Sequence, residues 1–391
     1  MQTLEYTPAR LEVLQHARLK YRCEDAHGTA TIRTASAQPS PIAKCNAGAG
    51  LLAQVLVAKY ADHLPLARQE RIFARHGALL SRQTLCDWAL ASAELLRPLM
   101  APLHQHVLSC PVIFADDTKL ALHPGRGSHR GKTIPARLWA YVAGGARRDE
   151  HGRWQAVAPA ALYDFTCSRA GEHPRRILQG WSGYLQADDL SAHQALFRSG
   201  AITHCGCWAH ARRRYEAIVK TAPKGSPPGL AHEALRFIGE LYRVERETAL
   251  ASPDERQRQR QQRTRPLLDD MLRWLQQHAP TVLPKSPLGQ AFGYTLSNWD
   301  ALTVFLDAGM VLADNNTCER GMRPVAVSRK NWLFAGSERG GHAAALAFSL
   351  IETAKLNDVE PYAYLKDVLS RINDHRCDRL VELLPMHWKP A

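Results

Sequence analysis

The segment VIFADDTKL, residues 112–120, decides the fold of this chain, because a short apolar run ends there on an acidic residue, Asp116. The same pattern returns in GYLQADDL, residues 183–190, where Asp188 follows another strand-like stretch. Side chains at the carboxyl ends of neighbouring parallel strands meet at one edge of an α/β sheet. The two segments therefore predict strands whose ends bring Asp116 and Asp188 together.

A third acid, Glu319, lies in ADNNTCERGMRP, residues 313–324, a polar segment that can open a helix. Three carboxylates gathered at one place provide the oxygen ligands that Mg²⁺ prefers. A pair of such ions activates an attacking water or 3′ hydroxyl and stabilises a leaving oxygen during phosphodiester chemistry. Because crowded carboxylates repel one another, we expect the pKa of at least one of them to rise without metal.

Each acid also has a simpler interpretation, since an Asp after a strand is commonly a turn former or a helix N-cap. Asp117 and Asp189 directly follow the two chosen aspartates, and Asp314 is a weaker rival of Glu319. Adjacent side chains on an extended strand point to opposite faces. Only one member of each aspartate pair is therefore expected to reach a metal.

Strand-like and helix-like segments follow one another in a mixed order. Apolar, β-branched or aromatic residues predict three successive strands, then a helix, a fourth strand and, beyond a second helix, a fifth strand. The segments are CPVIFA (110–115), LWAYVA (138–143), ALYDFT (161–166), the helix EHPRRILQGW (172–181), GYLQA (183–187) and THCGCWA (203–209). From these residues alone, the fold class is mixed α/β.

Six segments of the chain are similar to the successive signature blocks of insertion sequence 66 family transposases, which are DDE-type DNA recombinases. They are ADDTKLALHPG (115–125), RLWAYVAGGA (137–146), GYLQADDLSAH (183–193), HCGCWAHARRRYEA (204–217), DNNTCERGMRPVAVSRKNWLFAGSERGG (314–341) and SLIETAKLNDVEPYAYLKDVLSRI (349–372). The resemblance runs from about Leu4 to Trp388. It implies a ribonuclease H-like mixed-sheet core with a helical insertion.

The resemblance also implies the site. The family's catalytic, metal-binding acids fall on Asp116, Asp188 and Glu319, and the implied cofactor is a pair of Mg²⁺ ions, with Mn²⁺ as an alternative. The family usually carries Glu in place of Asp117 and Gly in place of Asp189. That departure makes these two residues the non-catalytic neighbours.

Composition shifts and the resemblance divide the chain into six parts. They are the remnant of an N-terminal zinc-binding-like module (1–35), a helical DNA-binding region (36–104), the first part of the catalytic core (105–214), a helical insertion (215–300), the second part of the core (301–360) and a C-terminal tail (361–391). Cys23 and His27 offer two ligands where a structural zinc site needs four, so zinc is not expected as a cofactor.

Residues 66–96 resemble a helix-turn-helix. The pattern predicts a helix over 66–76, a turn at Gly77 and a second helix capped by Ser81. The second helix would present Arg82 and Gln83 to bases in a major groove. The alternative is a small helical bundle packed on the core.

Several basic residues lie close to Glu319 in the sequence. Arg320, Arg323, Arg329 and Lys330 follow Glu319 and are candidates for holding DNA phosphates.

Cys207 and His210 form a Cys-x-x-His pair. As a metal half-site the pair is incomplete, so we interpret it as structural, with a core cysteine beside a histidine that orients a backbone group or an acid. The triplet Arg212 to Arg214 contacts phosphates or forms a solvated helix face, the charge run at 255–265 predicts an exposed helix, and residues 346–354 predict an amphipathic one.

Net charge, hydropathy and cysteine content indicate which partners and which cellular location to expect. The formal net charge is +13 with a pI near 9.5, which favours a polyanion, and double-stranded DNA is the natural candidate. No apolar run reaches the roughly 20 residues of a membrane span, and the first residues lack the apolar region of a secretory signal. Nine cysteines in no repeating framework indicate reduced thiols. We expect a cytoplasmic, nucleoid-associated protein without membrane partners.

The sequence therefore predicts a DNA transposase that cleaves transposon ends in a metal-dependent reaction and transfers a strand to target DNA. It is expected to act as a homo-oligomer on element ends and target, with accessory element-encoded proteins as further partners. Two alternatives stay open: a ribonuclease H-like nuclease or resolvase without strand transfer, and a catalytically inactive DNA-binding relic.

Overall fold

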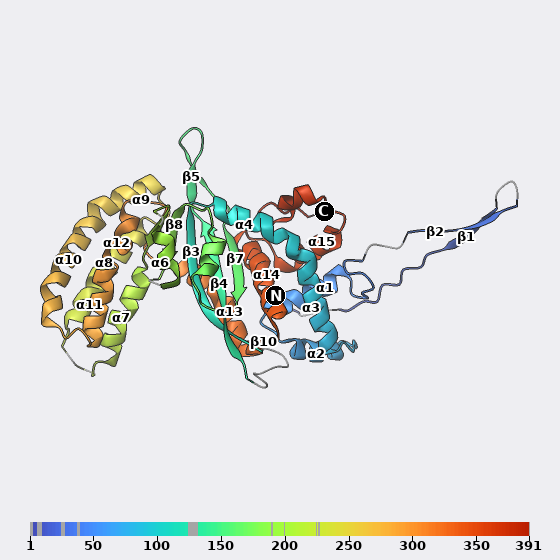
Figure 1. The fold of residues 1–391 in the computed structure, drawn as a ribbon, viewed down its shortest axis with the longest axis horizontal. Coiled ribbons are helices and arrows are strands. Elements are labelled where there is room, and N and C mark those ends of the chain that lie inside the picture. Colours follow the sequence, from blue (N-terminus) through green and yellow to red (C-terminus); the bar gives the residue numbers. More distant parts are fainter. Residues whose placement is uncertain are drawn as a thin grey trace.

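Strand β3 (Val112–Leu122) lies at the centre of a mixed six-stranded sheet in the computed structural model, which describes residues 3–5, 10–24, 28–36, 40–123, 132–188, 191–198, 200–223, 225 and 227–390. The strand order is β7-β4-β3-β8-β9, and the short β10 also pairs with β3 (Figure 1). β3, β4 and β7 are antiparallel neighbours, whereas β8, β9 and β10 join in parallel. The remaining strands are β4 (Ile134–Gly144), β7 (Ala160–Thr166), β8 (Gly183–Ala187), β9 (Ile202–Cys205) and β10 (Phe334–Ala335). The predicted mixed α/β class is confirmed, and all five predicted strands form, with β3 and β4 longer than expected. The fifth strand is shorter than the predicted 203–209, because it ends at Cys205 and helix α7 begins at Trp208.

The outer edge of β7 is covered by helix α14 (Glu338–Leu356). Ser349 and Thr353 accept hydrogen bonds from the edge N–H groups of Tyr163 and Ala161 at 2.8 and 3.0 Å. These contacts satisfy backbone donors that would otherwise be buried without a partner. Gly341 lies so close to the Phe165 ring that an added Cβ would approach within 2.6 Å. Helix and strand therefore pack in direct contact.

The prediction that residues 346–354 form an amphipathic helix with one exposed face is wrong. Almost every residue from Gly341 to Ala354 is buried. The reason is tertiary, because α14 is enclosed between β7 on one side and helices α1 and α3 on the other. A helix that is surrounded by other elements has no solvent face to mark with polar residues.

The expected helix-turn-helix is confirmed as secondary structure. Helix α2 (Leu66–Arg75) ends before Gly77, which has φ of +80°, and Ser81 caps helix α3 (Arg82–Leu96) by accepting the Thr84 N–H. This region shares the core of the sheet, since α3 packs on α14 and α1 packs on α15. The other helices here are α1 (Ala49–Tyr60), η1 (Arg97–Leu99), α4 (Met100–Ser109) and α15 (Pro361–Arg371), followed by η5 (Cys377–Leu383).

Beyond β9 the chain forms a helical lobe at the opposite end of the sheet (Figure 1). Its helices run side by side and return to the core just before helix α13 (Asn316–Trp332). They are α7 (Trp208–Thr221), α8 (Leu230–Glu247), α9 (Pro253–Gln259), the π-helix η2 (Arg260–Thr264), α10 (Arg265–His278), η3 (Ala279–Thr281), α11 (Pro287–Ser297), α12 (Trp299–Thr303) and η4 (Val304–Leu306). The lobe runs from Trp208 to Leu306, and the helical sequence expected at 215–300 lies within it.

The charge run at 255–265 is not simply an exposed helix. Arg260 is fully buried, pairs with Glu245 through two hydrogen bonds of 2.8 and 2.6 Å, and donates to the carbonyls of Phe305, Ala308 and Val311. A buried guanidinium is tolerated when it is paired and its donors are satisfied. Arg260 thus anchors the lobe to the segment that leads into α13.

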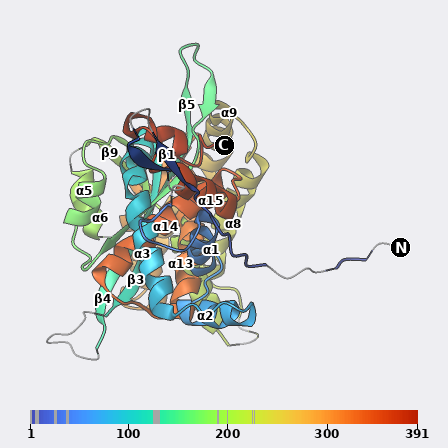
Figure 2. The same cartoon turned by 90° about the vertical axis from the view of Figure 1, so that its right-hand side faces the viewer.

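Two hairpins project from the body, whereas the short helices α5 (Glu172–Ile177) and α6 (Ser191–Phe197) lie on either side of β8 in the chain. Strands β1 (Lys20–Glu24) and β2 (Ala30–Thr34) form an exposed antiparallel ribbon, and β5 (Ala146–Arg148) pairs with β6 (Trp154–Ala156) in a second hairpin (Figure 2). Cys23 is exposed in the first ribbon, and His27 lies outside the described residues. Among the described helices, none is long and apolar enough to cross a bilayer.

Candidate active site

The register of the sheet places the first two acids beside each other. Ala115 of β3 pairs with Ala187 of the parallel strand β8, so Asp116 and Asp188 are the next residues along the two neighbouring strands. Asp116 also lies opposite Ala140 of β4, on the face that carries α13. Parallel pairing directs both side chains toward that face.

Glu319 reaches the same place from the first turn of α13. The buried Asn315 precedes this helix and donates from Nδ2 to the carbonyl of Ala115 at 3.0 Å. Its backbone N–H donates to the Cys207 sulfur at 3.2 Å. Asn315 therefore ties the start of α13 to both β3 and the start of α7.

Two residues of α7 contact the acids directly. His210 Nε2 lies 3.6 Å from Asp188 Oδ2 and 3.9 Å from Glu319 Oε1. Arg213, one turn later, forms a 2.6 Å ion pair with Glu319 Oε1. Burial lowers the pKa of His210, and Arg213 and Arg214 lower it further against the opposing effect of the two acids. The histidine thus lies between the second and third acids.

Asp116 is the acid most strongly perturbed by its surroundings. Burial raises its pKa to about 6, and the carboxylates of Asp117, Glu319 and Asp188 add to the rise. The N–H of Asp117 opposes this by donating to Asp116 Oδ1 at 2.8 Å. Burial is the largest cause of the raised pKa, and the expected repulsion among the clustered acids contributes to it.

A recess of about 490 Å³ opens beside these acids. Its walls come from β3, α7 and α13, and they include Asp116, Thr118, His210, Arg213, Asn316, Glu319, Arg320 and Arg323. Carboxylates on its floor and arginines on its rim suit a cation inside and an anionic group outside.

The rival acids have other partners. Asp117 lies opposite Trp139, on the other face of the sheet, where its buried carboxylate pairs with Arg137 at 2.9 Å and Arg169 at 2.8 Å. Asp314 accepts the N–H of Asn316 at 3.0 Å in the turn that opens α13. Asp189 lies outside the described residues.

The helical lobe reaches into the site through Tyr294 of α11, whose hydroxyl donates to Asp188 Oδ1 at 2.7 Å. The arginine triplet explains how this tyrosine is held. Arg214 stacks on the Tyr294 ring at 4.0 Å and Arg212 on Tyr242 at 5.7 Å, while Arg213 between them faces Glu319. Helical geometry sends alternate members of the triplet to different neighbours.

The predicted DNA-binding residues separate into three groups. Arg82 and Gln83 are exposed at the start of α3, where Gln83 bonds Asp87 at 2.9 Å. Arg320 and Arg323 are exposed on the rim of the recess, and Lys330 is exposed farther along α13. Arg329 instead folds back and donates to the carbonyl of Lys119 on β3. The structure does not bring Arg82 and Gln83 to the acid cluster.

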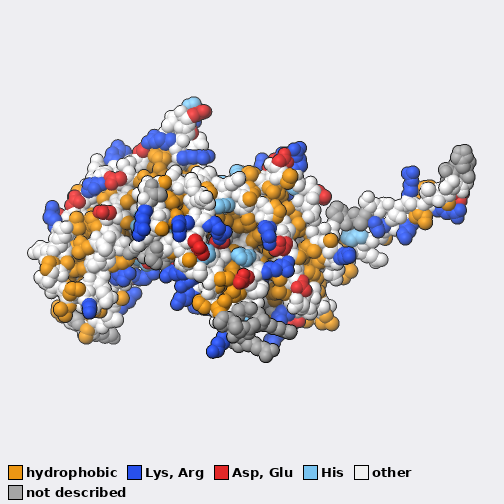
Figure 3. Space-filling model, in the orientation of Figure 1, with side chains coloured by type: hydrophobic (Ala, Val, Ile, Leu, Met, Phe, Trp, Pro, Cys, Tyr) orange, Lys and Arg blue, Asp and Glu red, His pale blue; other side chains and the backbone are white. Residues whose placement is uncertain are grey.

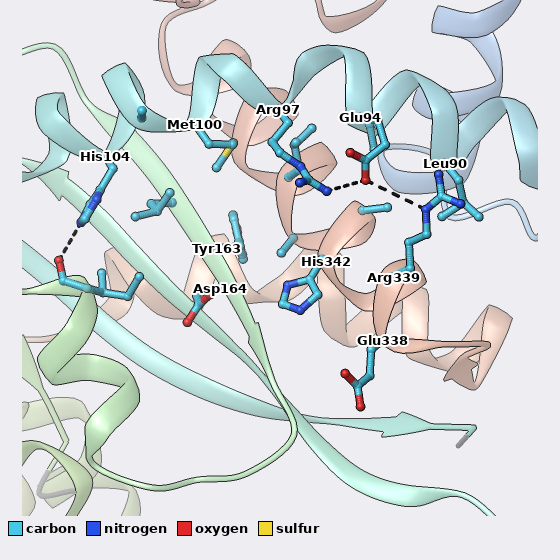
Figure 4. A pocket seen from close by; sticks show the side chains of 17 residues that line it. Leu90, Glu94, Arg97, Met100, His104, Tyr163, Asp164, Glu338, Arg339 and His342 are labelled. Atoms are coloured by element: carbon cyan, nitrogen blue, oxygen red, sulfur yellow. Dashed lines mark hydrogen bonds and ion pairs between the residues drawn. The ribbon is translucent and has the colours of Figure 1, made fainter. Parts of the chain in front are cut away.

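A larger cavity of about 770 Å³ lies on the other side of β7, between α3, α4 and α14 (Figure 4). Glu94 lies there between Arg97 at 2.5 Å and Arg339 at 4.0 Å, and His104 contacts the carbonyl oxygen of Ile177 at 2.6 Å. None of Asp116, Asp188 and Glu319 lines this cavity. Size alone therefore does not mark the site of chemistry.

Sequence reasoning missed Tyr294 and Asn315. Tyr294 lies in an apolar helical segment that looks like ordinary core, and it carries no signal of its own. Asn315 does carry one, because it stands in the DNN run just before the helix that presents Glu319. An amide at a helix start is commonly placed to bond backbone groups.

Comparisons with known proteins cover almost the whole chain. A family model described as "Transposase IS66 family" matches residues 44–343, and one described as "IS66 C-terminal element" matches residues 349–386. Three similar proteins come from Sinorhizobium fredii, and all three are described as uncharacterized. The protein y4hP is 35% identical across 100% of this chain and 70% of its own length, y4jD is 36% identical across 99% and 75%, and y4qI is 34% identical across 87% and 62%.

Proposed function

Because the chain belongs to the IS66 family of transposases, we propose that it cleaves phosphodiester bonds at the ends of a mobile element and joins the freed 3′ hydroxyl to target DNA. The observation that carries this proposal is that Asp116 and Glu319 line one recess while Asp188 lies next to Asp116 on the neighbouring strand, with His210 near both Asp188 and Glu319. The strand order, three antiparallel strands followed by two parallel ones, supports a ribonuclease H-like core.

The residues present fit divalent metal ions. Carboxylate oxygens are hard ligands, and the raised pKa of Asp116 reflects buried negative charge that a cation would neutralise. In this proposal Asp116, Asp188 and Glu319 hold two Mg²⁺ ions, and Mn²⁺ can replace them. The bound ions would activate the attacking oxygen and stabilise the leaving oxygen.

The chain's own residues then have distinct tasks. Tyr294 orients the Asp188 carboxylate by donating to one oxygen, and Arg213 orients Glu319. The exposed guanidinium groups of Arg320 and Arg323 hold the scissile phosphate at the mouth of the recess, where bidentate contacts align it for in-line attack.

DNA contacts extend beyond the recess. On the face in Figure 3, Lys and Arg side chains are spread along the molecule among acidic and hydrophobic ones, in agreement with the net charge of +13. We assign base contacts to Arg82 and Gln83 at the start of α3, and phosphate contacts to Lys330. We assign Arg329 the task of holding α13 against β3.

We further propose that the protein acts in the cytoplasm, at the nucleoid, as a homo-oligomer assembled on element ends, with accessory element-encoded proteins. Binding that rests on phosphate contacts should weaken steeply with salt. Lys330→Ala, which removes a proposed phosphate contact, is expected to weaken binding to element-end duplexes and reduce the salt dependence of the affinity.

The decisive experiment compares Asp188→Asn with wild type on labelled element-end duplexes, with and without Mg²⁺. The variant should lose cleavage and keep DNA affinity within a few-fold, because affinity depends mainly on phosphate contacts. Asp374→Asn, at an exposed residue after α15, is the matched control and should cut normally. Cleavage by Asp188→Asn at the wild-type rate would refute the assignment.

The same assay distinguishes a transposase from the two alternatives, a nuclease without strand transfer and an inactive DNA-binding protein. Pre-cut ends incubated with target DNA give joined products only if strand transfer occurs, so cleavage without joining identifies a nuclease. A DNA-binding protein without chemistry would cut nothing and would gain no thermal stability from Mg²⁺.

A further inference from the structure

Three potential ligands of different chemistry lie together beside the acid cluster. Donor atoms of Cys207, His210 and Glu319 all lie within 4.8 Å of one another. Cys207 and His210 come from the start of α7, and Glu319 comes from the first turn of α13. The half-site visible in the sequence thus gains its third ligand from a distant segment.

This donor set differs from the carboxylate set in the metal it favours. Mg²⁺ takes oxygen ligands almost exclusively, whereas a sulfur and an imidazole nitrogen are typical ligands of Zn²⁺. Zinc sites with three protein ligands and one further oxygen are common. Asp188 Oδ2, 3.6 Å from His210 Nε2, or a water is placed to supply that oxygen.

The surroundings of Cys207 resemble those of a metal thiolate. Its sulfur is fully buried and accepts the N–H of Asn315 at 3.2 Å, and because burial raises the pKa of the thiol to about 11, a bound metal would displace its proton. Backbone donors of this kind stabilise a thiolate and fix its orientation, as outer-shell contacts do in metal sites.

The imidazole of His210 is available as a ligand. Its Nδ1 is buried and has no hydrogen-bond partner within the described part of the chain, and Nε2 is 3.6 Å or more from both carboxylates. A buried imidazole nitrogen that has no hydrogen-bond partner in the described structure is unusual. A cation bound here would satisfy it.

We propose that Cys207, His210 and Glu319 form a Zn²⁺ site that overlaps the proposed Mg²⁺ site and inhibits cleavage when occupied. Zinc would engage Glu319 and so withdraw it from the magnesium ions. The binding part of this proposal stands on the geometry alone. The inhibitory part rests on the proposed function.

Metal binding is tested first, on the full chain without DNA. Co²⁺ is the probe, because a cobalt–thiolate bond gives a charge-transfer absorption band that nitrogen and oxygen ligands do not give. The wild type should show the band and lose it on addition of Zn²⁺. The affinity for Zn²⁺, measured by competition with a chromophoric chelator, should fall at least tenfold in Cys207→Ser, since even loss of an outer-shell partner costs about 10–100-fold.

Serine suits this position because it is close to cysteine in size and its hydroxyl can still accept the N–H of Asn315, so the variant should keep the local fold. Cys205→Ser is the matched control, since Cys205 is also buried and lies two residues earlier in β9. It should keep both the cobalt band and the affinity for zinc. An unchanged band in Cys207→Ser, or no band in the wild type, would overturn the site.

Inhibition is tested second, with each protein compared to its own zinc-free rate in Mg²⁺. Micromolar Zn²⁺ should inhibit the wild type and Cys205→Ser, and inhibition of Cys207→Ser should need at least tenfold more zinc. Equal inhibition of all three proteins would contradict the regulatory part. Should none of them cleave DNA, the proposed function fails, and the cobalt band still decides whether the zinc site exists.

Discussion

The hydroxyl of Tyr294 donates a 2.7 Å hydrogen bond to Asp188 Oδ1, so the helical lobe directly orients an acid at the edge of the sheet. Burial raises the pKa of Tyr294, and its hydrogen bond to Asp188 raises the pKa further, so the phenol remains a donor. The ring is held in place by Arg214 of α7. The helical lobe therefore contributes a residue to the candidate active site.

Tyr294→Phe should lower the Mg²⁺-dependent cleavage rate about 10-fold or more and raise the Mg²⁺ concentration needed for half-maximal rate, as loss of an outer-shell contact does. Tyr215→Phe is the matched control. This change removes a 2.8 Å hydrogen bond from Tyr215 of α7 to Thr295 of α11, the helix that carries Tyr294. Neither residue contacts one of the three acids. Equal effects of both changes on the Mg²⁺ requirement would mean that Tyr294 acts only through helix packing.

Asp116 and Asp117 should respond in opposite ways to substitution. Asp117→Asn should lower the free energy of unfolding by roughly 2–4 kcal/mol, because it leaves Arg137 and Arg169 without their buried partner. It should keep the thermal stabilisation given by Mg²⁺. Asp116→Asn should lose that stabilisation, and thermal melts with Mg²⁺ or EDTA measure both effects. The reverse pattern would assign the metal to Asp117.

The raised pKa of Asp116 predicts how the metal-free protein responds to pH. Its value of about 6, against 3.8 for an ordinary aspartate, means that the folded chain holds the proton more tightly than the unfolded chain. This contribution to stability is fully present below pH 3.8 and is lost as the pH rises through 6. The full difference corresponds to about 3 kcal/mol.

The measurement is the melting temperature in EDTA at pH values from 4 to 7.5, for the wild type and Asp116→Asn. Asparagine at position 116 does not titrate. The melting temperature of the variant minus that of the wild type should therefore increase as the pH rises from 4 to 7.5. Other titrating groups are common to both proteins and cancel in the difference. A constant difference would show that the Asp116 carboxyl is not perturbed by burial.

Local patterns in the sequence were sufficient to predict the strands, the Ser81 cap and the helix that begins before Glu319. Each of these depends on a few adjacent residues. The hydrogen bond from Tyr294 to Asp188 joins residues 106 positions apart, and nothing near either residue indicates it. The buried Arg260 was missed for a related reason, because its partners Glu245 and Phe305 lie in other helices and its own neighbours are polar.

Asn315 should couple the site to the sheet. Asn315→Ala removes the 3.0 Å bond to the carbonyl of Ala115, next to Asp116, and leaves a buried acceptor without a partner. The expected cost is about 1–3 kcal/mol of unfolding free energy. Because the start of α13 is then less firmly held against β3, the Mg²⁺-linked stabilisation should fall as well. Chemical denaturation with and without Mg²⁺ gives both quantities.

Asn357→Ala provides the comparison, since its Nδ2 donates to the carbonyl of Pro159 at 2.8 Å and it likewise joins a helix to the sheet. It should lose a similar amount of stability and retain the full response to Mg²⁺, because Asn357 lies after α14 and contacts none of the acids. If Asn315→Ala also retained the full response, the position of Glu319 would be independent of this amide. The packing of α13 on β3 and β4 would then be sufficient to hold the three acids together.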